Sequence, residues 1–473
     1  MIPVSVNPNF IPQDILSSWS QATQAALAAL LQTPGITLGH LEELLEAQAR
    51  KLMLPILSAA AHALAALQPF VCHHCQEPLR VEAKHRVRGI DSVLGSFDFT
   101  RPYGACPACH SYCHPADRAL GLQPQAPASP RVQEISALMS IRSPYVQAAQ
   151  DAQRLTGLSP SPSFLHQETS RQGQRALGLR EADIALSYTP QGVAQLAARS
   201  ATAGVGPFTL IIEIDAWNIR ERDDWGRTRQ LRRKGQEPER WHWVFTGTVF
   251  RLDQRGQTDG GRPTITQRGY VATRQGLDAF TQQLYVEALL RGLLSAQQVL
   301  IIADGAIWIW NLAQDRFKNA KQRVDLFHVK EHLHELARSL HGAGTPEAKA
   351  WLQPLLRFLD RRQDGALDVL HCLQELRLSS KPLTAAQQED LDKEIGYFTT
   401  HQERMDYKQA RARGEPVGSG AIESTARQYQ TRFKCTGQYW TLEGDESLLA
   451  LATLKRNERW HLLFPHAQAS KTP

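Results

Sequence analysis

Three acidic residues stand at points of the sequence where a protein can hold a side chain rigidly. An apolar run that begins at Leu210 ends on Asp215, and a second run that begins at Val299 ends on Asp304. Short apolar runs of this kind predict buried strands, and a buried strand holds its end in place. Glu423 follows a Gly-Ser-Gly sequence at the expected start of a helix. Three such carboxylates can bind hard divalent cations, which indicates chemistry on a phosphodiester.

The metal expected at these carboxylates is Mg²⁺ or Mn²⁺. Two such ions roughly 3.5–4 Å apart can activate the attacking oxygen, neutralise the phosphate and stabilise the leaving oxygen. We assign Asp215 to bridge both ions, with Asp304 and Glu423 each holding one. Simpler interpretations stay open. The two aspartates can cap strands or turns, Glu423 can pair with Arg427 on a solvated helix, and Glu213, on the same strand face as Asp215, can be the ligand instead.

A second metal site is predicted by four of the seven cysteines. One Cys-x-x-Cys pair is Cys72 and Cys75, and the other, after thirty intervening residues, is Cys106 and Cys109. Each pair can form a tight turn that points two thiolates at one ion, and two pairs supply tetrahedral Zn²⁺. Alternating residues between the pairs predict a hairpin, so we expect a zinc-ribbon-like module with a structural zinc ion. Three nearby residues stay open as replacements for Cys109, namely Cys113, His110 and His114.

Length and composition limit the class of protein. At 473 residues the chain is too long for one compact core, so several domains are expected. Hydrophobic residues make up 42% and charged residues 21%, and the formal net charge of +6 is compatible with a nucleic-acid partner. No apolar run approaches the roughly 20 residues of a membrane span, and the first residues lack a signal-peptide pattern. We therefore expect a cytoplasmic protein that does not enter a membrane.

The chain is expected to be an α+β protein of several domains. Residues 1–67 predict an N-terminal helical region, with Thr37 as a helix cap and a buried apolar stretch over 52–67. Residues 68–124 form the zinc-ribbon-like module. Residues 125–206 predict a helix-turn-helix-like DNA-binding segment, although generic helix packing explains the pattern equally well. The polar face of the last helix of this segment carries Gln167, Ser170, Arg171 and Gln174.

Residues 207–331 predict the first part of a catalytic core. The expected order is three strands, a helix and a fourth strand, followed by a fifth strand over 324–328. This order is that of the RNase H-like fold, a mixed α/β fold in which the first and fourth strands are neighbours. Asp215 and Asp304 would then lie side by side. Two further parts complete the chain, an all-helical insertion at 332–414 and a return to the core at 415–473 with the third acid and C-terminal helices.

Basic side chains near the three acids could neutralise DNA phosphates. One group lies in 229–240, which we expect to be a loop beside the first strand. Another lies among Tyr429, Phe433, Tyr439 and Trp440, whose rings could stack on an unpaired base or form a core patch under a solvated face. The candidate DNA-binding residues are Arg232, Arg233, Lys234, Lys318, Lys321, Arg323, Arg432 and Lys434.

These motifs resemble bacterial insertion-sequence transposases of the DDE class, and the ISKra family in particular. The resemblance rests on Ile-Glu-Ile-Asp-Ala-Trp around Asp215, Ile-Ala-Asp-Gly around Asp304 and Gly-Ser-Gly-Ala-Ile-Glu-Ser around Glu423. It covers most of the chain, from the paired cysteines to Trp460. The resemblance implies that Asp215, Asp304 and Glu423 are the catalytic triad.

A second element follows the fourth strand. Asp325-x-x-His328 is similar to an element found after the second aspartate in related Mutator-like enzymes. The resemblance implies that His328 contacts the scissile phosphate or positions water, with a packing histidine as the alternative. Cys435 interrupts a basic run where the family pattern implies another cation, which weakens the argument for DNA contact there without affecting the triad.

Three functions fit the sequence. The expected one is a transposase that cleaves DNA and transfers the strands of an insertion sequence. It would act as a homodimer or higher oligomer on double-stranded DNA, both at the terminal inverted repeats of the element and at the target. The alternative is a non-catalytic, sequence-specific DNA-binding protein derived from a transposase. A third is an RNase H-like nuclease that only hydrolyses. The intact set of three acids favours the first, because a pure DNA-binding protein does not need all three.

Overall fold

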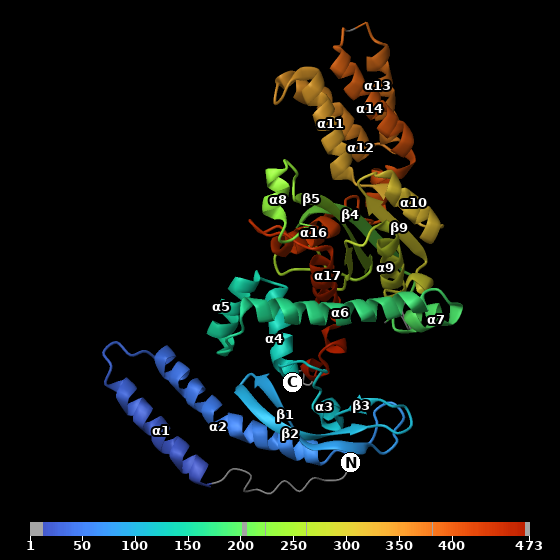
Figure 1. The fold of residues 1–473 in the computed structure, drawn as a ribbon. Coiled ribbons are helices and arrows are strands. Elements are labelled where there is room, and N and C mark those ends of the chain that lie inside the picture. The colour runs from blue at the N-terminus through green and yellow to red at the C-terminus, as the bar shows by residue number, and fades with distance from the viewer. Residues whose placement is uncertain (1–12, 201–205, 223, 262, 381, 469–473) are drawn as a thin grey trace. The chain divides into compact units, whose positions relative to one another are not determined.

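The computed structural model describes residues 13–200, 206–222, 224–261, 263–380 and 382–468. The ends of the predicted N-terminal and DNA-binding segments, 1–12 and 201–205, lie outside the described residues. The chain divides into two compact units, Met1–Thr169 and Ser170–Pro473, with the boundary inside helix α6 (Pro162–Leu186). Helices and a mixed sheet make this an α+β protein, as predicted (Figure 1). Within the described ranges, every helix is too short or too polar to cross a membrane.

The first unit combines a helical hairpin with a small antiparallel sheet. Helices α1 (Gln13–Leu31) and α2 (Leu38–Ala66) pack together, and Thr37 is the N-cap residue of α2, as predicted. Leu64 is 40% exposed, so the predicted burial of the whole stretch 52–67 is wrong. A narrow stripe of α2 is buried instead, at Gln48, Leu52, Ala61 and Ala65. The other elements of this unit are β1 (Arg80–Ser92), β2 (Gly95–Ala105), β3 (Tyr112–Cys113), α3 (Pro115–Ala119), α4 (Pro130–Ser140) and α5 (Tyr145–Thr156).

A five-stranded mixed sheet forms the centre of the second unit. Its order is β10-β9-β4-β5-β8. β9 is parallel to β4 and β10 is parallel to β9, whereas β5 is antiparallel to both of its neighbours, β4 and β8. The strands are β4 (Thr209–Arg222), β5 (Glu239–Arg251), β8 (Gly269–Thr273), β9 (Gln298–Ala303) and β10 (Lys321–Val324), and a separate small hairpin contains β6 (Arg255–Gln257) and β7 (Pro263–Ile265).

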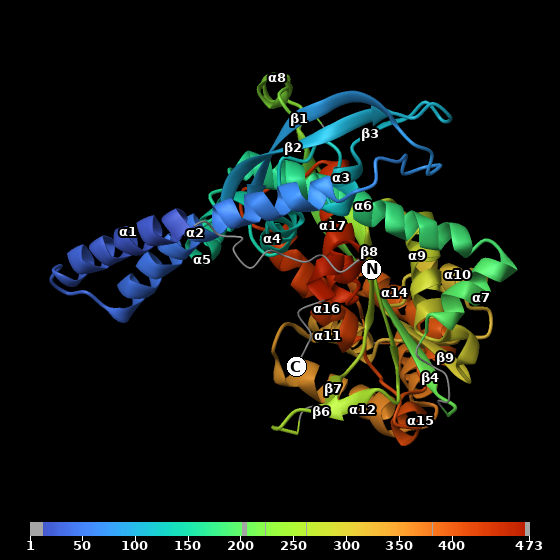
Figure 2. The same ribbon diagram turned by 90° about the horizontal axis from the view of Figure 1, so that it is seen from below.

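Alternation along β4 decides which helix each side chain faces. Ile212 joins a core cluster with Phe280 of α9, while Ile211 joins Ala421 of α16 on the opposite face. Successive strand residues point to opposite faces, so Asp215 lies on the α16 side of the sheet. Figure 2 shows α9 and α16 on opposite sides of the strands. The covering helices are α9 (Leu277–Leu290), α10 (Ile307–Arg316), α16 (Gly420–Phe433) and α17 (Leu442–Arg456).

Between β10 and α16, the described residues form helices and turns with no strand. The helices are α11 (Leu326–His341), α12 (Pro346–Arg361), α13 (Gly365–Leu378), α14 (Ala385–His401) and α15 (Tyr407–Ala412), and Figure 1 shows α11 to α14 gathered as a bundle beyond the sheet. The fifth strand expected at 324–328 is wrong, because β10 ends at Val324 and Asp325 begins the next helix. The carboxylate of Asp325 accepts the N–H of Phe327 at 2.5 Å, which caps α11.

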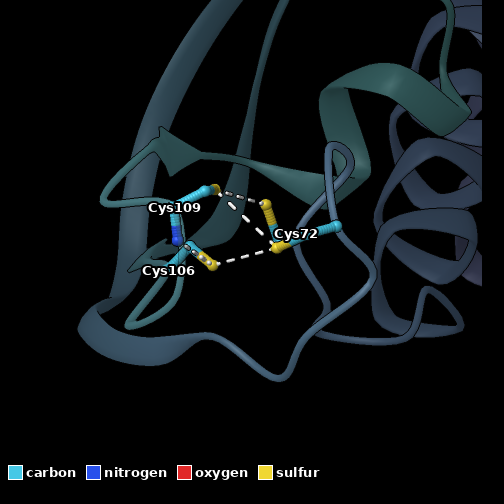
Figure 3. A group of neighbouring side chains, drawn as sticks. Cys72, Cys106 and Cys109 are labelled. Carbon is cyan, nitrogen blue, oxygen red and sulfur yellow. Dashed lines mark hydrogen bonds between the residues drawn. The ribbon is translucent and has the colours of Figure 1, made fainter.

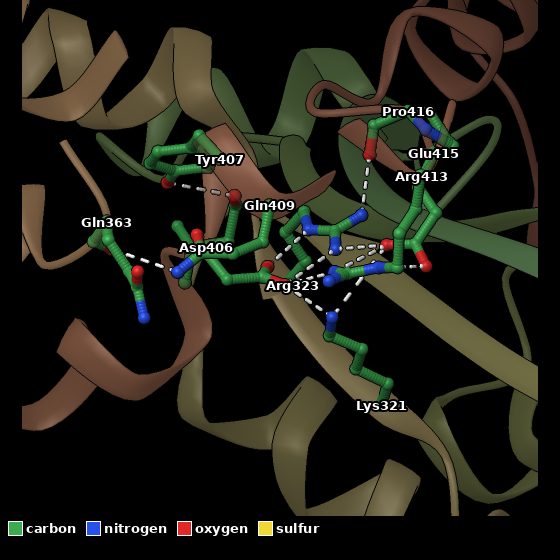
Figure 4. Close-up of polar contacts among 10 residues, drawn as sticks. Lys321, Arg323, Gln363, Asp406, Tyr407, Gln409, Arg413, Glu415 and Pro416 are labelled. Atoms are coloured by element: carbon green, nitrogen blue, oxygen red, sulfur yellow. Dashed lines mark hydrogen bonds and ion pairs between the residues drawn. The ribbon is translucent and has the colours of Figure 1, made fainter. Parts of the chain in front are cut away.

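A buried ion network ties the end of the helical insertion to β10 (Figure 4). Arg323 is fully buried and donates to Asp406 at 2.8 Å, to Glu415 at 2.5 Å and to the carbonyl of Pro416 at 2.8 Å. Burial by itself would raise the pKa of Asp406, but hydrogen bonds from Arg323 and Lys321 outweigh burial and lower the pKa to about 2. Since α16 begins a few residues later, the network also sets where that helix starts.

Removing the central cation of this network is expected to destabilise the second unit. Arg323→Met keeps the buried volume similar but leaves Asp406 and Glu415 without their buried partner. Breaking a buried ion pair on one side costs about 3–5 kcal/mol, and we expect a loss of that size in the free energy of unfolding measured in urea. Lys318→Met removes the same charge from an exposed position and should change stability by less than about 0.5 kcal/mol. Equal losses for the two variants would contradict the role given to Arg323.

Candidate metal centres

Asp304 follows β9, whereas Asp215 lies within β4, which continues to Arg222, so the prediction that the first strand ends at Asp215 is wrong. β4 and β9 pair in parallel up to Glu213 and Ile302, and continuing this register by two residues sets Asp215 opposite Asp304. The carboxylate of Asp215 accepts the N–H of the next residue at 2.7 Å, and that of Asp304 accepts the N–H two residues later at 2.9 Å. The contact of Asp304 is that of a turn cap, whereas the contact of Asp215 is made within β4.

The start of α16 is held against the sheet by two buried acids. Asp325 accepts the backbone N–H of Ser419 at 2.5 Å and also the hydroxyl of that serine. Glu213 accepts the N–H of Ile422 at 2.8 Å. Both contacts join segments far apart in the sequence, and sequence reasoning missed both. Together they fix the first turn of α16, which carries Glu423.

Glu213 is the alternative ligand that the sequence left open. Burial raises its pKa to about 8, and the charge of Asp325 adds to this effect. The N–H of Ile422 donates to the Glu213 carboxylate, which gives Glu213 a role in positioning the start of α16.

Asp325, His328 and Glu423 form a group that could hold a metal ion. One ligand atom of each residue lies within 4.8 Å of those of the other two. Asp325 is buried, whereas the side chains of His328 and Glu423 are each 40% exposed. Among the described residues, Asp215 and Asp304 belong to no such group. The structure thus places Glu423 next to the Asp325-x-x-His328 element. The sequence motif pointed to this element, but the predicted metal ligands did not include Asp325 or His328.

The donors of this group differ in their availability. Both oxygens of Asp325 already accept hydrogen bonds, from Phe327 and Ser419. Glu423 lies 3.7 Å from Arg427, the weak exposed pair that the sequence left open. Carboxylates suit Mg²⁺ and Mn²⁺, and imidazole suits transition metals, so a set that includes His328 fits Mn²⁺ better than Mg²⁺.

The other predicted catalytic residues affect the pKa of Asp215. Burial raises the pKa of Asp215, the charges of Asp304 and Glu423 raise it further, and His328 lowers it. The charges of Asp304, Glu423 and His328 thus act on the Asp215 carboxylate. A divalent cation among them would relieve the repulsion between the like charges.

Tyr397 of α14 connects the helical insertion to Asp304. Its hydroxyl donates to the backbone carbonyl of Asp304 at 3.3 Å. Its ring stacks on His332 with centroids 4.1 Å apart, and His332 lies 3.0 Å from the buried Glu394. Gly305 has a φ of +106°, and a Cβ there would lie 3.2 Å from Tyr397, so glycine is favoured at this close approach. The sequence carries no local signal for this contact, because the two residues belong to different domains of the predicted map.

The two Cys-x-x-Cys pairs bring four sulfur atoms together, and Figure 3 shows Cys72 facing Cys106 and Cys109. All four Sγ atoms lie within 4.8 Å of one another, with separations of 3.5 Å for Cys72 and Cys109 and 3.4 Å for Cys75 and Cys106. A tetrahedron with Zn–S bonds near 2.3 Å has edges of about 3.8 Å. A hydrogen bond with Ser111 contributes most to lowering the pKa of Cys72 to about 5, whereas a hydrogen bond with Cys106 and burial raise the pKa of Cys75. The cluster could hold a structural zinc ion.

The three alternative zinc ligands lie outside this four-sulfur group. Cys113 is buried, and burial raises the pKa of its thiol. Nδ1 of His114 lies 3.0 Å from the carbonyl of Pro102. His110 has a φ of +57° in the turn after Cys109. The geometry therefore favours Cys109 as the fourth ligand.

The predicted DNA-contacting cations divide into buried and exposed residues. Arg323 and Arg432 are buried, and the prediction that they contact DNA is wrong. The first lies in the ion network, and the second stacks over the ring of Trp440 at 5.0 Å. Lys321 is held by Asp406 in the same network. The cations that remain exposed are Arg232, Arg233, Lys234, Lys318 and Lys434.

The predictions for the basic segment 229–240 and for the aromatic residues near Glu423 both need correction. The basic segment expected as a loop contains a short helix, α8 (Thr228–Arg233). Tyr429, Phe433 and Trp440 are buried, so they form the core patch that the sequence left open and do not stack on bases. Tyr439 alone of these four aromatic residues is partly exposed.

The helix-turn-helix-like segment contains the predicted helices and ends with α7 (Pro190–Ala198). Its helix α6 extends to Leu186. On the predicted polar face, Gln167 and Gln174 are exposed, and Gln174 donates to Ser447 of α17 at 3.3 Å. Part of this face is therefore used for packing within the second unit.

A scan against protein-family models finds no matching model, and no curated protein matches the chain. The resemblance to ISKra-type transposases stays an expectation drawn from the sequence motifs.

Proposed function

We propose that the protein is a transposase that cleaves DNA strands and transfers them by metal-ion-assisted phosphoryl transfer. The observation that carries the proposal is the parallel register of β4 and β9, which sets Asp215 opposite Asp304. Glu423 approaches from α16 and acts on the pKa of Asp215. The charges of Asp304 and Glu423 both raise the pKa of Asp215, and a bound divalent cation would offset this repulsion.

The strand order supports an RNase H-like core. With the five strands of the sheet numbered along the chain, their order is third, second, first, fourth, fifth. The second strand runs against the other four. The first and fourth strands are neighbours, as the element order of the sequence led us to expect. The helical insertion follows the fifth strand and returns the chain with the third acid.

Each acid has its own role in the proposed reaction. Two Mg²⁺ or Mn²⁺ ions, when bound, would activate the attacking oxygen and stabilise the leaving oxygen. Asp215 would be a ligand of both ions, because the charges of Asp304 and Glu423 both act on its pKa. Asp304 and Glu423 would each bind one ion. His328 is close to Glu423 and partly exposed, so it can contact a phosphate oxygen or orient water. Asp325 keeps the first turn of α16 in place.

The proposed partner is double-stranded DNA, as the terminal inverted repeats of the element and as the target. The exposed cations Arg232, Arg233, Lys234, Lys318 and Lys434 can neutralise phosphates. The protein would act on DNA as a homodimer or higher oligomer. The zinc-ribbon-like module and the helices of 125–206 would add contacts that fix the register of the DNA.

One observation favours the alternative, a non-catalytic DNA-binding protein derived from a transposase. The carboxylates of Asp215 and Asp304 accept nearby backbone N–H groups. A binding protein would keep these hydrogen bonds without using the carboxylates in catalysis. The two functions differ in one respect that can be measured, because the alternative binds DNA and leaves both strands intact.

The test is strand cleavage in Mn²⁺ or Mg²⁺, with the DNA that flanks the coding region as substrate. We expect wild-type cleavage, and a loss of at least about 100-fold for Asp215→Asn and for Asp304→Asn, since each removes a ligand charge. Asp278→Asn, at an exposed helix position, is the matched control and should cleave normally. DNA binding without cleavage by the wild-type protein would support the alternative function.

A further inference from the structure

The β4–β5 pair continues well beyond the rest of the sheet. Pairing of β9 with β4 stops at Glu213, and pairing of β8 with β5 stops at Phe245. Beyond these points the two strands pair with each other as far as Arg222 and Glu239, and the segment at Trp440 adds a parallel bridge along the edge of β4. One face of this extension packs into the core, with Trp217, Ile219 and Val244 buried, and the opposite face carries exposed aromatic side chains.

A stack of alternating aromatic rings and guanidinium groups covers one side of this ribbon. Arg220 lies over Trp241 at 5.2 Å and over Tyr439 at 5.5 Å. Arg222 lies over Tyr439 at 4.0 Å and over Trp225 at 5.0 Å. The order is therefore Trp241, Arg220, Tyr439, Arg222, Trp225, with each cation between two rings. Cation–π contacts of this kind hold large flat side chains in fixed orientations.

The tryptophans of this region are exposed although they are large and apolar. Trp225 is 53%, Trp241 61% and Trp243 55% exposed. Trp243 pairs with Asn218 two residues along β5 from Trp241, so both indoles project from the same face of the ribbon. Exposed indoles held in fixed positions mark a binding surface. We call these six residues the Trp–Arg surface: Arg220, Arg222, Trp225, Trp241, Trp243 and Tyr439.

The charge around the Trp–Arg surface is positive. Two of the nearby acids, Glu221 and Glu239, are paired with arginines and hidden from solvent. Asp224 and Glu237 are the exposed acids among the described residues from 218 to 243. Against them stand seven exposed cations, which are Arg220, Arg227, Arg229, Arg232, Arg233, Lys234 and Arg240. This surface therefore attracts a polyanion with flat apolar groups.

We propose that the Trp–Arg surface binds an unpaired DNA strand. Bases stack on the indoles of Trp241 and Trp243, while the surrounding cations contact phosphates. A duplex hides the faces of its bases, so flat rings of this kind select unpaired nucleotides. Arg220 lies five residues from Asp215 along β4 and projects from the opposite face of the strand, so the Trp–Arg surface is a binding site separate from the carboxylates. This proposal rests on the proposed function for the identity of the ligand as DNA.

The test is binding of a fluorescently labelled single-stranded oligonucleotide of about 20 nucleotides, followed by anisotropy in EDTA so that no cleavage occurs. The double variant Trp241→Ala/Trp243→Ala should bind the single strand at least about tenfold more weakly, because each lost stacking contact is worth roughly 1–3 kcal/mol. Its affinity for a duplex of the same sequence should change less than about twofold. The double variant Trp241→Tyr/Trp243→Tyr should recover most of the single-strand affinity.

Tyr188→Ala removes another exposed aromatic side chain of the same unit, which is 65% exposed, and should leave both affinities unchanged. An unchanged melting temperature shows that the variants are folded. Wild-type single-strand affinity in the tryptophan-to-alanine variant overturns the proposal, as does an equal loss on duplex DNA. The assay does not depend on cleavage, so a wild-type protein that binds the single strand but never cuts DNA would remove the proposed function and leave this surface in place.

Discussion

Glu423→Gln is expected to abolish DNA strand cleavage while leaving DNA binding largely intact. Glutamine keeps the size and hydrogen-bonding capacity of the side chain but removes the charge that a divalent cation requires. The side chain is 40% exposed and its ion pair with Arg427 is long, at 3.7 Å, so the substitution should cost little stability. We expect cleavage in Mn²⁺ to fall by at least about 100-fold, measured as nicked product per unit time with DNA affinity determined in parallel.

The matched control for this substitution is Glu389→Gln, an exposed acid on the helical insertion, which should cleave at the wild-type rate. Cleavage by Glu423→Gln at a rate near wild type would remove Glu423 from the site. Asp325 would then be the next candidate, because it lies in the same metal-binding group. Asp325→Asn would have to be judged together with a measurement of folding, since this carboxylate also holds Ser419.

Cys72→Ser is expected to lose the bound zinc ion and to unfold the module around it. Elemental analysis should give about one zinc per wild-type chain and close to none for the variant. The small sheet of β1, β2 and β3 has a limited core, and structural zinc supplies roughly 10–16 kcal/mol of apparent binding free energy in small zinc-dependent domains. The loss should appear as rapid proteolysis between residues 68 and 124.

Cys113→Ser is the control for the zinc prediction, because this thiol is also buried but lies outside the four-sulfur group. It should retain the metal and its resistance to protease. Full zinc content in the Cys72 variant would contradict the assignment of ligands. Loss of zinc in the Cys113 variant, with Cys109 dispensable, would instead transfer the fourth position to Cys113.

The strands that carry Asp215 and Asp304 were predictable from their apolar runs, although β4 continues seven residues beyond Asp215. The cysteine cluster was predictable because its spacing is a local pattern. The end of the fifth strand was not. Val324-Asp325-Leu326 has the apolar character of a strand, but the carboxylate of Asp325 accepts the Phe327 N–H and begins a helix. Whether Asp325 continues a strand or caps a helix depends on one side-chain hydrogen bond. The hydrophobic periodicity of the sequence does not reveal that bond.

The burial of basic residues was also beyond prediction from the sequence. Arg323 and Lys318 look equivalent in the chain, yet one is fully buried and the other exposed. What separates them is a pair of acids more than eighty residues away, Asp406 and Glu415. The same holds for Glu213, whose partner Ile422 lies 209 residues further along the chain. Long-range partners of this kind decide which charges face solvent, and no local pattern encodes them.

The ion network around Arg323 also constrains the order in which the chain can fold during synthesis. β10 is made more than eighty residues before Asp406 and Glu415, at a typical pace of about 5–20 residues per second. Until those acids emerge, Arg323 has no partner to offset the cost of burying its charge, so the edge of the sheet is completed only after the whole helical insertion has been made. The third acid follows within a few residues of Glu415. A nascent chain therefore cannot gather Asp215, Asp304 and Glu423 early, and a product truncated within the insertion lacks both the finished sheet edge and the third carboxylate.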